Sequence, residues 1–414
     1  MSAMQRLWLL LLWAAGTACA DDLDALKLAD QPAPKAERAS DSHWYAETAL
    51  VSARYGKSRA YNQRLSLEFQ LDKTLAPGWR AVLADRLDLN WRQQPARQDG
   101  VNTLKEAYLS RQLSTEQIVD LGRINVTQGL ASGYNPTDFL RDGALRSVIS
   151  VDPASLKKNR LGSVMLRGQQ LWDGGSLTAL YSPKIAAQAN GAALSPDFGA
   201  TNKRERWLLA LSRQMTPTLA PQWLLYGSRG QAPQFGFNLS CLLNDATVLY
   251  LEWAGGRSRS LLSQALHGAD DSAFRNRLAS GLTYTTPNKL TLTLEYEYNG
   301  SAPDDAGWDA LGRGSPLAYA TYRAWQQQQQ ELPTRQEVFF YANWQDAGLN
   351  HLDLAAMQKY NLADHSRLSW LEARYHLDKV DLALQWQGHN GTPVSAYGAA
   401  AQQRAWQLLL RYYF

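Results

Sequence analysis

Charged residues recur at every second position in segments that otherwise alternate with apolar side chains. Arg64 and Glu68 occupy polar positions of one such segment, and Glu295 and Glu297 occupy those of another. Successive side chains of a β-strand point to opposite faces, so the charges share one face and the leucines share the other. Fixed charges on one face of a sheet act strongly on ions in confined water. The pattern therefore predicts selective passage or binding of small charged solutes.

If the apolar faces point outward, the charged faces line the inside of a closed sheet. The set expected there is Arg64, Glu68, Arg80, Arg86, Asp88, Arg167, Arg275, Arg277, Glu295, Glu297, Glu372, Arg374 and Arg411. Both signs occur in similar numbers. Two interpretations stay open: the charges create a field across a hydrated pore, or they neutralise one another and fill the wall.

Residues that could support catalysis are scattered. His351, His365, His376 and His389 fall in separate late strands and loops, and no Gly-x-Ser-x-Gly element occurs. No spacing of Cys, His, Asp and Glu is typical of a metal site. We therefore expect no enzymatic activity, no metal ion and no cofactor.

The elements that position the charges are about eighteen alternating segments. They lie near 44–55, 63–72, 79–91, 102–114, 117–129, 160–172, 175–183, 203–215, 220–230, 234–243, 246–257, 273–285, 289–299, 334–345, 349–361, 365–377, 379–390 and 402–414. The connections alternate between short turns and longer loops. An even strand number, short turns on one rim and long loops on the other are typical of outer-membrane barrels. The predicted fold class is an all-β transmembrane antiparallel barrel with short periplasmic turns and long extracellular loops.

The chain begins with an apolar run, Leu7–Ala15, followed by Ala18-Cys19-Ala20, which indicates a secretory signal peptide. We expect a signal peptide over 1–20, a periplasmic tail over 21–42 and the barrel over 43–414. Lipidation at Cys19 is the alternative to cleavage after Ala20.

One long connection, 130–159, is the expected constriction of the pore. Asn135-Pro136 favours a turn, and Asn135, Asp138, Arg141 and Asp142 would bring polar groups and charge into the lumen. The apolar stretch 148–151 would pack on the inner wall. A solvated surface loop is the alternative, and 300–333 is the next candidate for the constriction.

The last segment carries Trp406, Leu408, Leu410, Tyr412 and Phe414 on one face. This aromatic ending resembles the C-terminal strand of Gram-negative outer-membrane proteins. The resemblance implies that Tyr412 and Phe414 act as the assembly signal read by the barrel-assembly machinery.

The whole expected mature chain resembles Gram-negative outer-membrane porin-like barrels, in the size class of sugar porins and alginate-export porins. The resemblance implies a location in the cell outer membrane, among its lipid and lipopolysaccharide, and a channel for small polar or anionic solutes. An export pore for a secreted polymer, such as an anionic polysaccharide, and a closed structural or adhesive barrel are the alternatives. A net charge of +4 is too balanced for a nucleic-acid binder.

Overall fold

The computed structural model describes residues 41–93 and 96–414. The expected signal peptide and nearly all of the expected tail lie outside this part. The strands are β1 (Ser42–Tyr55), β2 (Ser58–Ala76), β3 (Trp79–Gln93), β4 (Ala96–Gln112), β5 (Gln117–Ile124), β6 (Ser163–Trp172), β7 (Gly175–Ser182), β8 (Arg206–Arg213), β9 (Leu219–Ser228), β10 (Gln234–Asn244), β11 (Thr247–Ser258), β12 (Ala273–Thr285), β13 (Leu290–Asn299), β14 (Gln336–Trp344), β15 (Leu352–Asn361), β16 (Arg367–His376), β17 (Val380–Asn390) and β18 (Gln402–Tyr413). The helices are α3 (Pro153–Lys158), α4 (Phe198–Thr201), α5 (Leu261–Ala265), α6 (Asp305–Arg313) and α7 (Pro316–Gln329).

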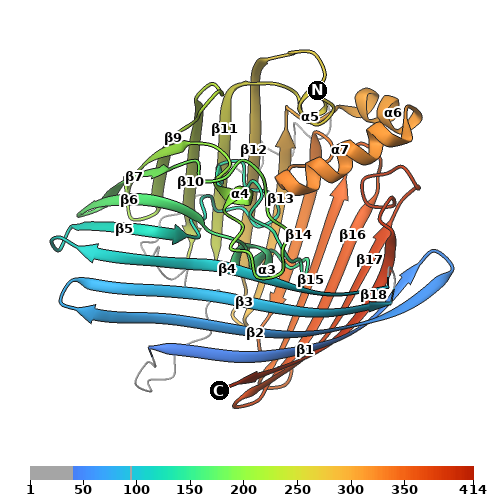
Figure 1. The fold of residues 1–414 in the computed structure, drawn as a ribbon, viewed down its shortest axis with the longest axis horizontal. Helices are drawn as coiled ribbons and strands as arrows, with labels where there is room; N and C mark the ends of the chain where they lie inside the picture. Colours follow the sequence, from blue (N-terminus) through green and yellow to red (C-terminus); the bar gives the residue numbers. More distant parts are fainter. Residues whose placement is uncertain (1–40, 94–95) are drawn as a thin grey trace.

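Every strand pairs antiparallel with its neighbours in the chain, and β1 also pairs with β18, so the eighteen-stranded sheet closes on itself (Figure 1). Closure leaves no unpaired strand edge, which is the condition for a sheet to cross a bilayer. The predicted fold class is confirmed. Among the described residues, none of the helices combines the length and apolar character that crossing a membrane requires.

The alternation separates two faces as expected. Leu65 and Leu67 on β2 are 37% and 48% exposed on the outside, whereas Ser66 and Glu68, which follow them in turn, point inward and are buried. Exposed aromatic rings gather on the outer face near both rims, as at membrane–water boundaries. Those near the long-loop rim include Tyr61, Trp91, Tyr181, Trp207, Phe274 and Trp406, and those near the opposite rim include Trp44, Trp79, Trp172, Tyr284, Tyr375 and Tyr412.

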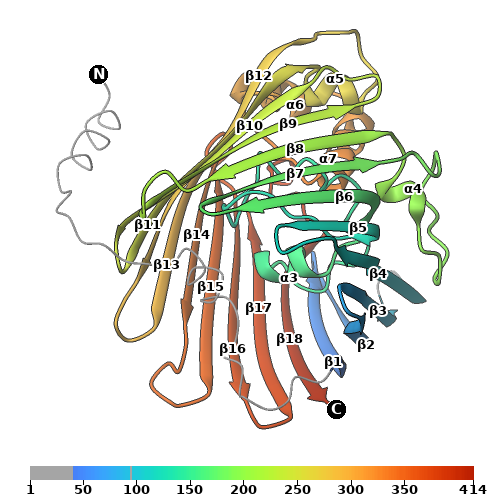
Figure 2. The ribbon, with the colours of Figure 1, turned by 90° about the vertical axis from the view of Figure 1, so that its left-hand side faces the viewer.

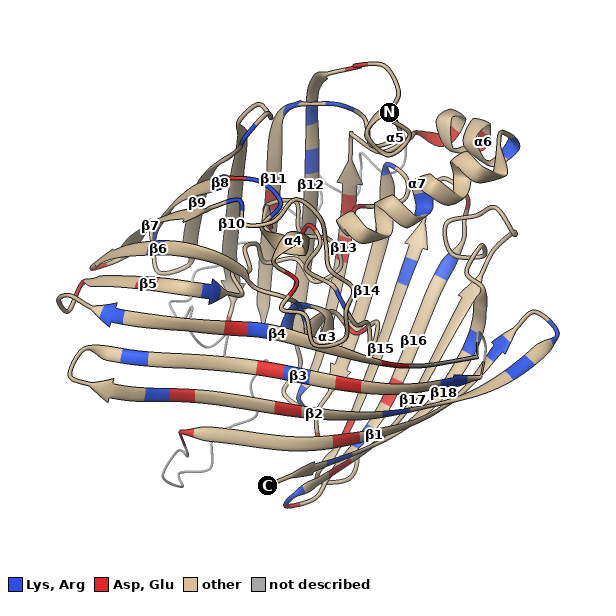
Figure 3. Cartoon of the chain, viewed as in Figure 1, with Lys and Arg blue, Asp and Glu red and all other residues tan. Residues whose placement is uncertain are grey.

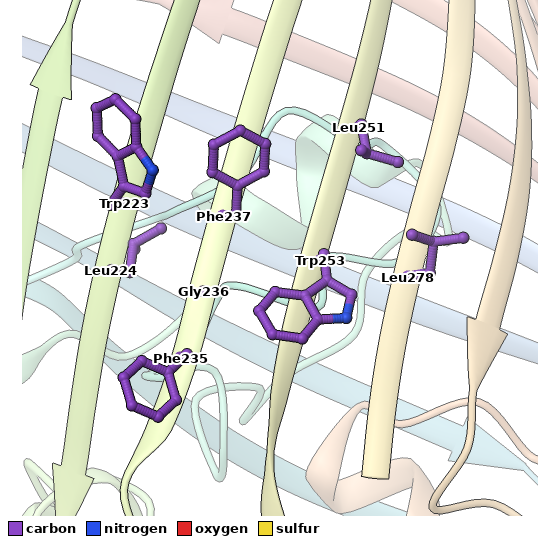
Figure 4. Close-up of a pocket in the computed structure, with 8 residues that line it drawn as sticks. All are labelled: Trp223, Leu224, Phe235, Gly236, Phe237, Leu251, Trp253 and Leu278. Atoms are coloured by element: carbon purple, nitrogen blue, oxygen red, sulfur yellow. The ribbon is translucent and has the colours of Figure 1, made fainter.

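An apolar hollow of about 670 Å³ lies against strands β9 to β12 (Figure 4). Trp223, Phe237 and Trp253 line it, and their rings belong to the outward-facing positions of β9, β10 and β11. On the inner side of the same strands, Phe139 stacks on Tyr226 with ring centroids 4.8 Å apart. The hollow therefore faces the surroundings of the barrel and does not belong to the lumen.

The connections between the strands differ in length at the two rims of the barrel. One rim has tight turns such as 77–78 and 173–174, and the other carries the long connections 125–162, 183–205, 259–272, 300–335 and 391–401. Strand β5 ends at Ile124, five residues before the predicted end at 129. The reason is that Arg160 donates to the backbone oxygen of Val126 at 2.6 Å and to Oδ1 of Asn125 at 2.7 Å, which draws the chain out of the sheet.

Candidate functional site

The connection 125–162, hereafter the inner loop, is bound to the barrel wall by two glutamates. Both views place its helix α3 within the ring of strands (Figures 1 and 2). Glu295 of β13 accepts hydrogen bonds from the backbone N–H groups of Ser132 at 2.6 Å and Gly133 at 2.8 Å. Glu252 of β11 accepts those of Leu130 and Ala131. Two carboxylates thus hold four consecutive N–H groups, and charge-assisted hydrogen bonds of this kind are about twice as strong as neutral ones.

Gly133 allows a close approach of this loop to the wall. A Cβ atom at this position would lie 2.0 Å from Oε1 of Glu297 and 2.6 Å from the ring of Phe339. No side chain fits in that space, so the contact requires glycine.

The residues expected to form the constriction all belong to this loop, and each has a partner. Asp138 pairs with Arg160 at 2.6 Å, Arg141 with Glu331 at 2.7 Å, and Asp142 with Lys203 at 2.7 Å. The side-chain amide of Asn135 donates to the backbone oxygen of Ala131 at 2.6 Å and to Glu252 at 3.2 Å. Asp138 and Arg141 are buried, so their first role in the structure is to fasten the loop.

The apolar stretch of this loop does not pack as the sequence suggested. Val148 is 60% exposed. Val151 instead packs against the buried cluster of Phe339, Met357, Leu368 and Trp370 on the inner wall. The contact of this stretch with the wall is therefore made by its last residue, Val151, and not by the exposed Val148.

Between the inner loop, α7 and the later strands lies a cavity of about 330 Å³. Its charged lining consists of five basic residues, Arg141, Lys157, Arg160, Arg323 and Lys359, and three acidic ones, Asp138, Glu331 and Glu337. The three acids face Arg160, Arg141 and Lys359, the last at 3.5 Å.

Two cations of this cavity are left in surplus. Lys157 donates to the backbone oxygen of Ala131 at 2.7 Å, and Arg323 lies over the rings of Trp308 and Tyr319. Neither forms an ion pair with an acid in the described part of the chain. The lining of the cavity therefore holds two more basic than acidic side chains.

Burial and neighbouring charges have opposite effects on the pKa of Glu331, which lies at the junction between the inner loop and the segment 300–335. Burial alone would raise the pKa of Glu331, but Arg141 and Arg277 outweigh it and hold that pKa below the ordinary value. Burial and the neighbouring Glu331 raise the pKa of Tyr134, whose hydroxyl donates to Glu331 at 2.7 Å. The carboxylate is therefore ionised and fully engaged at neutral pH.

The wall formed by β1 to β4 and β18 holds a network of opposite charges (Figure 3). Arg86, only 1% exposed, pairs with Glu47 at 2.9 Å, Glu68 at 3.2 Å and Asp88 at 2.9 Å. The further pairs are Arg64–Glu47 at 2.8 Å, Lys105–Glu68 at 2.5 Å and Arg411–Glu47 at 2.7 Å. On this side of the barrel the charges fill the wall, which is the second of the two interpretations.

The other predicted pore residues are spread over the remaining wall. Their pairs are Arg80–Asp72, Arg167–Asp120 at 2.8 Å, Arg275–Asp271 at 3.2 Å, Arg277–Glu331 at 3.6 Å and Arg374–Glu372 at 2.9 Å. Arg80 is half exposed near the short-turn rim, whereas Arg277 reaches the inner loop's partner Glu331. Of the predicted set, Arg277, Glu295 and Glu297 lie beside the inner loop or its partners, and Glu68, Glu372 and Arg374 interact electrostatically with Lys158 and Asp152 of this loop.

Sequence reasoning missed several residues of the site. Glu252 and Lys359 contact the inner loop, and Glu47 and Lys105 complete the wall network. Glu47 shares the inward face of β1 with Tyr45, so the alternation could have identified it. The role of Lys359, which donates to the backbone oxygen of Gly133 at 3.0 Å, had no local signal. No group of three or more His, Cys, Asp and Glu side chains suited to a metal ion occurs within 41–93 and 96–414.

Eighteen antiparallel strands closed into a ring, with an apolar outer face between aromatic rows, define an outer-membrane barrel of the porin type. No protein-family model and no curated protein sequence matches the chain. Among solved structures it is similar to porins of the Occ/Opd group. OpdL of Pseudomonas aeruginosa has a TM-score of 0.56 and 13% identity, over 90% of this chain and 98% of that one.

OccAB1 of Acinetobacter baumannii has a TM-score of 0.55 and 12% identity, over 90% of this chain and 96% of that one. OccK2 (OpdF) of Pseudomonas aeruginosa, solved in complex with glucuronate, has a TM-score of 0.54 and 11% identity, over 90% and 97%. At these identities the likeness establishes a shared fold.

Proposed function

We propose that the protein is an outer-membrane channel that passes small polar or anionic solutes through a lumen narrowed by the inner loop. The observation that carries this proposal is the cavity beside the loop, with Lys157 and Arg323 in surplus over its acids. A solute that crosses the barrel beside the loop meets these two cations.

The chemistry of the cavity favours a small carboxylated or otherwise anionic solute. A guanidinium and an ammonium bind carboxylate oxygens through charge-assisted hydrogen bonds, and their field is strong where water is confined. Rings of basic side chains are a general means of selecting anions in pores. The glucuronate found in the similar structure of OccK2 supports the same solute class.

The fastening of the inner loop supports a permanent constriction. Glu252, Glu295 and Glu331 bind the loop from three directions, and breaking a buried ion pair by removing one partner costs about 3–5 kcal/mol. A loop held in this way narrows the lumen at all times.

The test is a planar-bilayer recording of the purified protein under a salt gradient. We expect single-channel conductance and a reversal potential whose sign indicates selectivity for anions. Lys157→Gln combined with Arg323→Gln should move the reversal potential toward cations. The matched control removes two exposed cations away from the cavity, Lys184→Gln and Arg257→Gln, and should leave the reversal potential unchanged.

Other outcomes of the same recording would support one of the two alternative functions. An absence of conductance indicates the closed structural or adhesive barrel. Block of the current by a long polyuronate, with no block by the glucuronate monomer, indicates the polymer export pore. Cation selectivity of the wild type overturns the proposal.

A further inference from the structure

Three arginines stand side by side on the outer face at the long-loop rim. Arg54 of β1 is directly opposite Arg59 of β2 on one side and Arg404 of β18 on the other. Their chain neighbours Ala53, Ala60 and Ala405 are buried on the inner side, so the three arginines point outward, and all are exposed. We call this set the arginine row.

The arginine row lies at a defined depth relative to the band of exposed aromatic side chains that surrounds the barrel near this rim. Two residues along each strand toward the membrane lie Tyr61, Ser52 and Trp406, which also pair with one another, and Trp386 pairs with Trp406 in the same row. Tyr61 and Trp406 are 56% and 53% exposed. Such rings mark the membrane–water boundary. Two residues rise about 7 Å along a strand, which puts the arginines at the level of lipid headgroups.

The row lacks counter-charges from the protein. The segments 51–63 and 391–410, which contain it, include no Asp or Glu, and Lys57 adds a fourth cation at the hairpin tip. Within the described residues none of the three arginines forms an ion pair, and the one side-chain hydrogen bond among them runs from Arg54 Nε to the backbone oxygen of Gly56 at 3.0 Å.

This arrangement differs from the charges inside the barrel. Arg86 contacts three carboxylates, whereas like charges directly opposite one another in a sheet are destabilising. A polar pocket of about 270 Å³ opens at the row, lined by Arg54, Arg404, Gln403 and Asn390. Repelling cations beside a polar pocket are stabilised when an anion binds among them.

We propose that the arginine row binds the phosphate groups of lipid headgroups in the outer leaflet. The inference rests on the proposed outer-membrane location, in which the long-loop rim faces outward and the phosphate-bearing lipid there is lipopolysaccharide. Guanidinium groups bind phosphate in a bidentate manner. None of the three arginines lines the cavity that carries the proposed channel function, and His389 is the residue that lines both that cavity and the pocket at the row.

The experiment compares full-length protein, in neutral detergent micelles, with and without lipid A that carries both phosphates. Binding is read from the rise in the temperature at which the folded gel band is lost, over a range of lipid A concentrations. The test variant is Arg54→Gln, Arg59→Gln and Arg404→Gln. The matched control is Lys73→Gln, Arg111→Gln and Arg213→Gln, which removes three cations at the opposite rim. Channel conductance of each variant is recorded in parallel.

We expect wild type and control to be stabilised by lipid A, and the row variant to need roughly a hundredfold more lipid A for the same shift, as three cations near a charged surface predict. Replacement of the three arginines by lysine should restore most of the effect. Equal binding by the row variant overturns the proposal, and so does an equal shift of the wild type with inorganic phosphate or with neutral phosphatidylcholine. Conductance should stay at the wild-type value, so failure of the lipid site is distinct from failure of the channel function.

Discussion

Arg141 Nη2 lies 2.7 Å from Oε1 of Glu331, and this ion pair joins two loops that are 190 residues apart in the chain. Oε2 of the same carboxylate accepts hydrogen bonds from Tyr134 at 2.7 Å and from Asn299 at 2.8 Å. The two longest connections of the barrel are thus fastened to each other at one side chain.

The first prediction concerns this junction. Glu331→Gln keeps the shape of the side chain but leaves the buried Arg141 without its counter-charge, which should weaken the loop contact by about 3–5 kcal/mol. We expect brief conductance steps to become more frequent in single-channel recordings, together with faster proteolysis within 133–143. Asp271→Gln is the control, because its partner Arg275 lies at the rim. Unaltered recordings of the Glu331 variant would contradict the role of the pair.

The second prediction is the pH dependence of the same junction. The folded-state pKa of Glu331 is lowered, so its contribution is fully present above the ordinary glutamate value of about 4.3 and is lost as pH falls through the lowered pKa. In wild-type recordings, the frequency of brief conductance steps should therefore be the same at pH 7 and pH 5 and should rise below about pH 4. The Gln variant should show no such change with pH. A rise in the frequency of brief conductance steps that begins already at pH 6 would exclude Glu331 as its origin.

The third prediction concerns the close approach at Gly133. Gly133→Ala forces the backbone away from Glu297 and Phe339, which should displace the inner loop and raise single-channel conductance severalfold. Gly191→Ala is the matched control, since a Cβ there meets nothing within 4 Å and its φ is not in the left-handed region. Equal conductance in the two variants would mean that the loop does not set the width of the lumen.

The fourth prediction tests the outer face by depth. Thr48 and Ser52 lie on the outward side of β1, Thr48 in the row of Leu410 and Ser52 in the row of Trp406. Thr48→Arg should lower the unfolding free energy by about 2–4 kcal/mol, and Ser52→Arg by about 0–1 kcal/mol. Denaturant titration in lipid vesicles measures both, and a larger cost at Ser52 would refute the assigned membrane position.

The fifth prediction concerns the end of the chain. The backbone N–H of Phe414 donates to the oxygen of Trp44 at 3.2 Å, and its ring meets that of Tyr412 edge-on at 5.0 Å. Deletion of Phe414 removes both contacts and should leave exported protein that lacks the fast-migrating folded band on unheated gels. Tyr413→Phe, which changes the inward-facing neighbour, should keep that band. A normal folded band after the deletion would disprove the assembly role.

The fold was predictable because its signal is local and repeated. Segments such as 64–71 and 290–298 carry the two-residue period in their own sequence, and the alternation of turns and loops fixes which rim each strand end belongs to. Membership of the inward face follows from the same period. The existence, number and orientation of the strands therefore required no long-range information.

The site was less predictable because its contacts are long-range. Nothing near position 252 indicates that Glu252 binds N–H groups more than a hundred residues earlier. Val148 and Val151 are equally apolar, and only the position of Phe339 and Met357 decides that Val151 is the one that packs. Opposite charges on one face were visible in the sequence, but their cancellation around Arg86 depends on the register of three strands.

The ion pair between Glu47 and Arg411 lies across the seam where the first and last strands meet. The two edges at this seam stay open until the whole chain has been delivered, because no other pairing joins β1 to β18. A slip of one residue between β1 and β18 would turn Arg411 toward hydrocarbon and separate it from Glu47, whereas Arg64 and Arg86 would stay beside that carboxylate. The charge pair across the seam therefore favours the one register in which the first and last strands close the sheet.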